Sequence, residues 1–148
     1  MPQVTTRWTL TLDCSDVPVM VEFWRVALGY VAPAPPEGWT TWEDWLRDND
    51  VPEEEWGDGA GLDDPDGVLP DISFLLVPEG KAAKNRLHLD LQVSGGRHLD
   101  QGLRRTRIDA EVERLVGAGA TVLRRDEAGG VLDHVVMADP EGNEFCVV

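Results

Sequence analysis

The chain contains an internal repeat, and this repeat limits the possible folds more than any other feature. Each half is predicted as a strand, a helix that ends at glycine, further strands, an Asp-Pro-acid-Gly turn and a last strand. The turn lies at 64–67 in the first half and at 139–142 in the second. In such turns Asp bonds nearby backbone, Pro presets φ, and Gly accepts a positive φ. A repeated supersecondary unit constrains the fold more strongly than local propensities do.

The first half begins with an alternating pattern. Trp8, Leu10 and Leu12 alternate with polar residues, which predicts a half-buried strand. A helix follows, with Ser15 or Asp16 as candidate caps. Gly29 is placed to end this helix in the left-handed conformation. The next predicted strands begin at 30–31 and cover 72–77.

The same order returns after a polar connector at 78–85. A basic loop over 94–107, which contains glycines, leads to a helix that presents apolar residues from Ile108 onward. Gly117 and Gly119 close it. The predicted strands of this half cover 86–93, 120–123, 132–138 and 143–148.

Neither half has enough helix to cover both faces of a sheet. We therefore expect an α+β fold: two βαβββ modules that form one open mixed or antiparallel sheet, with helices on its outer face. The predicted organisation is a single domain over 1–148. Module one covers 1–78 and carries a Trp-rich acidic insertion at 33–64, and module two covers 86–148.

Length and charge exclude several classes of function. A chain of 148 residues suits one domain with a real core. A formal net charge of -15 disfavours nucleic acid and anionic membranes as partners. No apolar run is long enough to span a bilayer, and the N-terminus lacks a secretory pattern. We therefore expect a cytoplasmic protein. Two distant cysteines, Cys14 and Cys146, do not make a disulfide framework.

Several motifs resemble the vicinal oxygen chelate superfamily, which includes glyoxalase I, extradiol dioxygenases, fosfomycin resistance enzymes and bleomycin resistance proteins. The motifs lie at 16–30, 86–91, 118–121 and 137–145. Together they cover the chain except the insertion, and the sequence is especially similar to glyoxalase-like domains. This scaffold carries metalloenzymes and pure binding proteins alike, so the resemblance implies a fold before it implies a function.

The resemblance also implies where metal ligands would lie. The first-strand positions fall at Thr9 and His88, and the closing-strand positions at Leu75 and Cys146. Thr and Leu are poor ligands for divalent metals, and a catalytic site usually needs three protein ligands. Glu144 shares a face with Cys146, and Asp90 lies beside His88. We therefore expect no cofactor. The alternative is a divalent metal held by His88, Glu144 and Cys146.

The insertion combines aromatic rings with negative charge. Four of the six tryptophans lie in it: Trp39, Trp42, Trp45 and Trp56. Residues 37–66 carry twelve acidic side chains and one base, Arg47. These rings either attach the insertion to the domain or form a lid over a pocket. Aromatic faces with carboxylates suit a planar or cationic ligand. Bleomycin resistance proteins offer an analogy, since they are acidic binders of a cationic drug.

The leading hypothesis is a small-molecule-binding protein without the standard metal site. Its predicted ligand-binding residues are Thr9, Thr11, Trp42, Trp45, Trp56, Leu75, His88, Asp90, Glu144 and Cys146. The second hypothesis is a glyoxalase-like lyase or isomerase, with His88 as the candidate catalytic residue and with Glu144 and Cys146 beside it. The third is an interaction protein, because members of the superfamily often form homodimers. Phosphate-loop and hydrolase-elbow motifs are absent.

Overall fold

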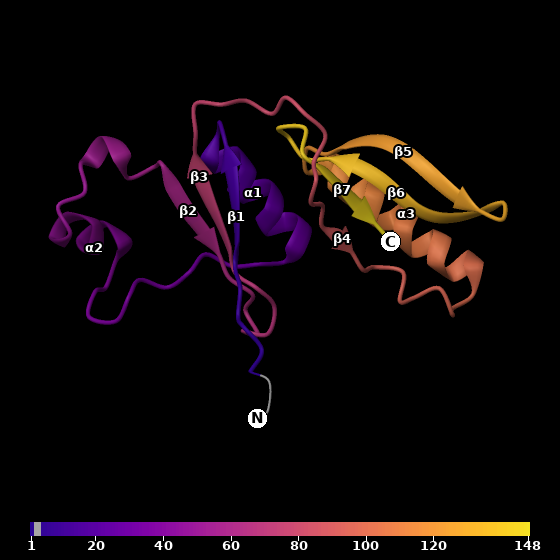
Figure 1. Ribbon diagram of the computed structural model, residues 1–148, viewed down its shortest axis with the longest axis horizontal. Helices are drawn as coiled ribbons and strands as arrows, with labels where there is room; N and C mark the ends of the chain where they lie inside the picture. Colours follow the sequence, from indigo (N-terminus) through magenta and orange to yellow (C-terminus); the bar gives the residue numbers. More distant parts are fainter. Residues whose placement is uncertain (2–3) are drawn as a thin grey trace. The chain divides into compact units, whose positions relative to one another are not determined.

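The computed structural model describes residue 1 and residues 4–148, which fall into two compact units, Met1–Gly80 and Lys81–Val148. Each unit has its own mixed sheet and its own long helix (Figure 1). No helix of the described part of the chain is long and apolar enough to cross a membrane.

The sheet of the first unit has three strands in the order β1-β3-β2. Strand β1 (Leu10–Cys14) pairs in parallel with β3 (Ile72–Leu76), and β2 (Gly59–Leu62) pairs with β3 in antiparallel fashion. Helix α1 (Val17–Leu28) packs against β2 and β3. The Asp16 carboxylate caps α1 by accepting from the Val19 N–H, and Gly29 ends it at φ 70°.

The core of the first unit forms between α1 and this sheet. Its largest fully buried side chains are Met20, Phe23, Leu62 and Phe74. Helix α2 (Trp42–Asp48) and the short 3₁₀ helix η1 (Glu53–Glu55) of the insertion have no buried residues, so they contribute nothing to this core.

The sheet of the second unit has four strands in the order β4-β7-β6-β5. Strand β4 (Asp90–Leu91) pairs in parallel with β7 (Glu144–Val147). The other pairings, of β7 with β6 (Val131–Ala138) and of β6 with β5 (Thr121–Ala128), are antiparallel. Helix α3 (Gln101–Gly117) packs against β5, β6 and β7 and buries Ile108, Val112 and Leu115.

The α+β class is confirmed, and the second unit has the full βαβββ order. The prediction of one sheet is corrected, since among the described residues the strands form two sheets, one in each unit. Alternating hydrophobicity identifies a strand but does not identify its hydrogen-bonding neighbour, so the sequence could not separate one sheet from two.

Several predicted elements differ in extent, and one strand forms where none was predicted. The predicted strand at 30–31 is a single bridge from Val31 to Asp63, and the strand at 86–93 is reduced to β4. Helix α3 begins at Gln101, inside the predicted basic loop, because Asp100 caps it through the Leu103 N–H. Strand β2 forms in a glycine-containing stretch where no strand was predicted, because glycines hide the strand pattern.

Candidate functional site

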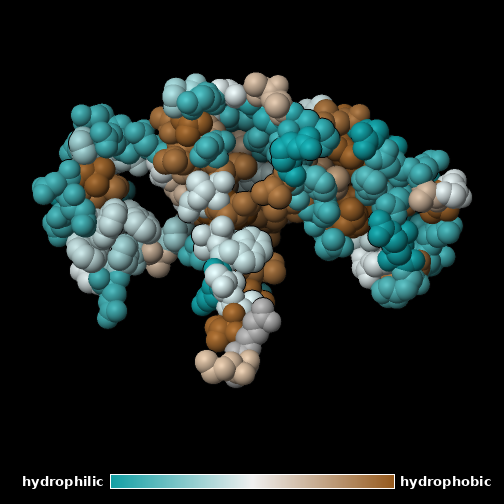
Figure 2. Space-filling view, in the orientation of Figure 1, coloured by the Kyte–Doolittle hydropathy of each residue, from teal (hydrophilic) through white to brown (hydrophobic). Residues whose placement is uncertain are grey.

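The first unit contains a cleft of about 720 Å³ between the insertion and the sheet. In Figure 2 the insertion is the mainly hydrophilic lobe at the left, and a hollow separates it from the rest of its unit. Three tryptophans and three carboxylates line the cleft: Trp42, Trp45, Trp56, Glu55, Asp63 and Asp71. The walls therefore combine ring faces with negative charge.

Trp42 and Trp56 are held so that their indole N–H groups are satisfied within the protein. Trp42 and Trp45 lie one turn apart on α2 and meet edge to face, with ring centroids 5.7 Å apart. The Trp42 indole N–H donates to the Pro33 carbonyl at 2.9 Å, and that of Trp56 donates to Val51 at 2.9 Å. Ring surface is thus left for the cleft. Trp39 instead donates to Asp48 and does not line it.

Among the described residues, no basic side chain forms an ion pair with the three carboxylates that line the cleft. Burial, with a further contribution from Asp71, raises the pKa of the Asp63 carboxyl. One cation already uses an aromatic face here: the Arg47 guanidinium carbon lies 5.7 Å from the centroid of the Trp56 ring. This contact shows that the Trp56 ring accepts a positive charge in this environment.

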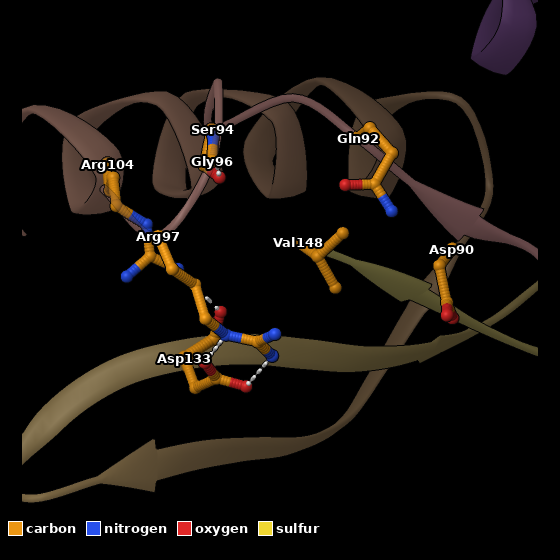
Figure 3. Close-up of a pocket in the computed structure, with 8 residues that line it drawn as sticks. All are labelled: Asp90, Gln92, Ser94, Gly96, Arg97, Arg104, Asp133 and Val148. Atoms are coloured by element: carbon orange, nitrogen blue, oxygen red, sulfur yellow. Dashed lines mark hydrogen bonds and ion pairs between the residues drawn. The ribbon is translucent and has the colours of Figure 1, made fainter. Parts of the chain in front are cut away.

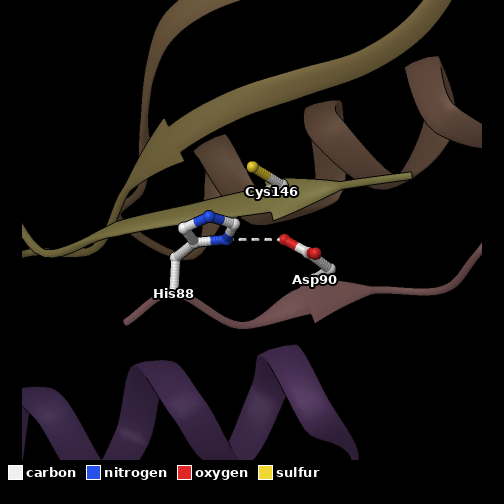
Figure 4. A group of neighbouring side chains, drawn as sticks. All are labelled: His88, Asp90 and Cys146. Carbon is white, nitrogen blue, oxygen red and sulfur yellow. Dashed lines mark hydrogen bonds and ion pairs between the residues drawn. The ribbon is translucent and has the colours of Figure 1, made fainter. Parts of the chain in front are cut away.

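A second group of candidate residues lies in the second unit. The parallel register of β4 and β7 places Asp90 opposite Cys146. His88, two residues before Asp90, turns its ring to the same place, and its Nδ1 lies 2.8 Å from the Asp90 Oδ1. One donor atom from each of His88, Asp90 and Cys146 lies within 4.8 Å of the others (Figure 4).

The Cys146 thiol is held in its protonated form. Burial and the neighbouring Asp90, which accepts its hydrogen bond, raise the pKa of Cys146 to about 11. A neutral thiol is a poor nucleophile, so this arrangement disfavours a Cys146–His88 nucleophilic pair. Imidazole, carboxylate and sulfur donors do fit a divalent metal such as zinc, which would have to displace the thiol proton.

Glu144 lies outside this cluster, so only His88 and Cys146 of the predicted set His88, Glu144 and Cys146 lie in it. Its carboxylate accepts from the Asn85 backbone N–H at 3.0 Å and lies 3.3 Å from the Lys81 ammonium. The Asn85 hydrogen bond is the largest cause that lowers the pKa of Glu144. Asp90 takes the place predicted for Glu144, because the two-residue spacing of His88 and Asp90 puts both side chains on one side of the chain.

The predicted site residues therefore separate into two groups. Thr9 and the three tryptophans line the cleft, while His88, Asp90 and Cys146 form the cluster. Thr11 and Leu75 are exposed on β1 and β3 and do not line the cleft. Sequence reasoning missed Asp71 as a cleft residue, and it did not distinguish Asp63 and Glu55 from the other acids. The turn at 64–67, which brings 63 and 71 together, was the available signal.

The comparisons with known proteins identify the family. The model of the glyoxalase-like domain matches residues 9–148. The chain belongs to this family. The match covers both units and the insertion between β1 and β3. The comparison with curated proteins found no match.

Solved structures share the fold of this glyoxalase-like protein at low sequence identity. A glyoxalase/bleomycin resistance protein/dioxygenase family enzyme from Burkholderia phytofirmans is 18% identical, with a TM-score of 0.58 and 94% of each chain covered. The fosfomycin resistance protein FosX from Listeria monocytogenes, solved with Mn(II) and 1S,2S-dihydroxypropylphosphonic acid, is 11% identical, with a TM-score of 0.61. That match covers 98% of this chain and 90% of FosX. At these identities the likeness concerns the fold alone.

Proposed function

We propose that this protein binds a small planar organic cation in the cleft of the first unit and needs no metal to do so. The observation that carries the proposal is the lining of a single cleft by Trp42, Trp45 and Trp56 together with three carboxylates. Its volume of about 720 Å³ lies in the range of small-molecule sites, roughly 300–1,000 Å³.

The energetic argument rests on the ring faces. A cation over an indole face gains about 0.5–1 kcal/mol when exposed and about 2 kcal/mol when desolvated. Trp45 and Trp56 are half-buried, so a ligand between the insertion and the sheet would lose part of its hydration there. Planarity adds stacking area, which favours flat aromatic cations over compact ammonium ions.

The protonation of Asp63 gives the proposal a pH dependence. A nearby cation stabilises the ionised carboxylate, so ligand affinity is greatest where Asp63 is deprotonated. Because the pKa of Asp63 is raised, affinity should begin to fall at a higher pH than an ordinary aspartate would require. Asp63→Asn should weaken binding at neutral pH and remove this pH dependence. Asp66→Asn, in the exposed turn, is the matched control that removes the same charge elsewhere.

Tryptophan variants test the site directly. N-methylacridinium, with bleomycin beside it, is titrated into the protein while tryptophan fluorescence is recorded. Trp42→Ala and Trp45→Ala should reduce the quench and the affinity together. Trp8→Ala should leave the affinity unchanged, since Trp8 is 65% exposed and lies outside the cleft lining. Variants that melt at lower temperature but keep the affinity of the folded protein would show that these rings only anchor the insertion.

The second candidate function is a metal-dependent lyase or isomerase, and the His88, Asp90 and Cys146 cluster favours it. These three residues would hold the metal, which would polarise a substrate oxygen as a Lewis acid. On the leading proposal, protein purified without chelators carries well under one equivalent of Ni, Zn, Fe or Mn. One metal per chain by elemental analysis, lost in both His88→Ala and Cys146→Ser, would instead support the metalloenzyme.

A further inference from the structure

The second unit buries a positive charge that has no ion-pair partner among the described residues. Arg104, in the first turn of α3, is 6% exposed. Its Nη2 donates to the Asp133 backbone carbonyl at 3.3 Å, and its Nε–H has no hydrogen-bond partner. Burying a guanidinium without a counter-charge is costly, so this side chain would be stabilised by an anionic ligand.

Arg104 lines a pocket of about 360 Å³ at the end of β4. The lining residues are Asp90, Gln92, Ser94, Gly96, Arg97, Arg104, Asp133 and Val148 (Figure 3). Arg97 supplies a second guanidinium. Its Nε and Nη2 donate to the two Asp133 carboxylate oxygens at 2.7 and 2.9 Å, a bidentate contact that fixes the side chain and leaves Nη1 without a bond in the described structure.

The two carboxylates of the pocket already have partners. Asp133 accepts from Arg97 and lies 2.9 Å from the His134 Nδ1. Both contacts hold the pKa of Asp133 far below its usual range, so it stays ionised and paired. Asp90 bonds the His88 ring and accepts from the Cys146 thiol. Neither carboxylate ion-pairs with Arg104, which leaves the Arg104 charge as the unmatched one.

We propose that this pocket binds a small organic anion through a carboxylate or phosphate group that pairs with Arg104 and Arg97. The site lies in the second unit and is independent of the tryptophan-lined cleft, so either proposal can fail while the other stands. A guanidinium matches the geometry of both groups, and the pocket volume leaves room for a body larger than the charged group itself.

The test is nuclear magnetic resonance of the ¹⁵N-labelled full chain. Inorganic phosphate and acetate are titrated against sodium chloride at matched ionic strength, and the Nε–Hε signals of the arginines are followed. The Arg104 signal, assigned by its loss in Arg104→Lys, should shift saturably with phosphate or acetate and not with chloride. The anion that binds more tightly identifies the charged group. An unmoved or linearly drifting Arg104 signal with both anions would overturn the proposal.

Thermal unfolding gives a second measurement. Phosphate or acetate should raise the melting temperature of the wild type by mass action but not that of Arg104→Met. Arg105→Met is the matched control, since Arg105 is the exposed neighbour in the same helix, and it should respond as the wild type does. Arg97→Gln, at an exposed side chain, keeps the test decisive if Arg104→Met does not fold, and it should weaken the anion response several-fold. Equal responses in all variants would contradict the site.

Discussion

At the scale of single residues, the cluster of His88, Asp90 and Cys146 shows how neighbouring groups determine the protonation of a thiol. The thiol lies beside a carboxylate and away from bulk water, and both features favour its neutral form. With a pKa of about 11, the thiol is almost entirely protonated at pH 7. Cys146 therefore acts as a hydrogen-bond donor in this structure.

Asp90→Asn should lower the pKa of Cys146, because it removes a negative charge from the neighbourhood of the thiol. More thiolate is then present at any pH below the pKa, so alkylation by iodoacetamide should become faster. The pH profile of the alkylation rate, measured in a Cys14→Ala background, checks this. Asp126→Asn should lower the pKa of Cys146 less than Asp90→Asn does, since Asp126 is the smallest of the causes that raise this pKa. A rate that Asp90→Asn leaves unchanged would contradict the assigned contact.

Motifs in the sequence located His88 and Cys146 and placed Asp90 beside His88, but they predicted Glu144 as the third member of the metal set. The closing-strand pattern and the alternation along 86–93 suffice to find His88 and Cys146. The choice of Asp90 over Glu144 as third member depends on Lys81 and Asn85, which hold Glu144 elsewhere. The burial of Arg104 could not be predicted from the sequence either, because it follows from the position at which α3 begins and not from the composition of its segment.

At the scale of elements, α1 and α2 are capped alike but embedded differently. Asp16 and Thr41 each accept a hydrogen bond from the backbone N–H three residues on. Helix α1 buries Met20, Phe23 and Trp24, whereas α2 buries no residue. Loss of the cap of α1 should therefore lower the global free energy of unfolding, whereas loss of the cap of α2 should reduce only the local order of that helix.

Asp16→Ala should lower the free energy of unfolding of the protein by about 1 kcal/mol. Thr41→Ala should leave global unfolding nearly unchanged and instead speed hydrogen exchange over 42–48. Chemical denaturation and hydrogen exchange followed by mass spectrometry measure the two effects. Equal losses of global stability in both variants would show that α2 belongs to the cooperative core.

Helix α1 was predictable because its caps and apolar stripe are local in sequence. Strand β2 was not, since Gly59 and Gly61 carry no side chains to alternate and its pairing with β3 is a tertiary contact. The reduction of the predicted strand at 86–93 to two residues has the same origin. Alternation is present there, but only Asp90 and Leu91 find a paired strand, in β7.

At the scale of the whole molecule, the proposal of a single domain over 1–148 concerns the coupling of two compact units. Asp16→Ala in the first unit and Leu115→Ala in the second should both shift one common thermal transition. The second change should cost about 2–5 kcal/mol, because Leu115 is fully buried. Calorimetry that resolves two transitions, each moved by only one of the variants, would show two independent domains.

The charge of the whole molecule also bears on the proposed ligand. A net charge of -15 attracts cationic ligands toward the protein over a distance that shortens as salt is added. This long-range attraction should add to the contacts that a cation makes inside the cleft. Cytoplasmic location and a homodimer stay predictions, and sedimentation velocity tests the second. The acidic surface favours neither nucleic acid nor anionic membranes as partners.

Calorimetric titration of the wild type with N-methylacridinium and with acridine tests the central claim most directly. The two molecules have nearly the same shape, but only N-methylacridinium carries a permanent positive charge. We expect saturable binding of the cation, weaker binding of neutral acridine, and a loss of cation affinity between low and high salt. Trp42→Ala and Asp63→Asn should each lower the affinity for the cation, while Trp8→Ala should leave it unchanged. Equal affinity for both rings, or no saturable binding of either, would contradict a cleft that selects planar cations.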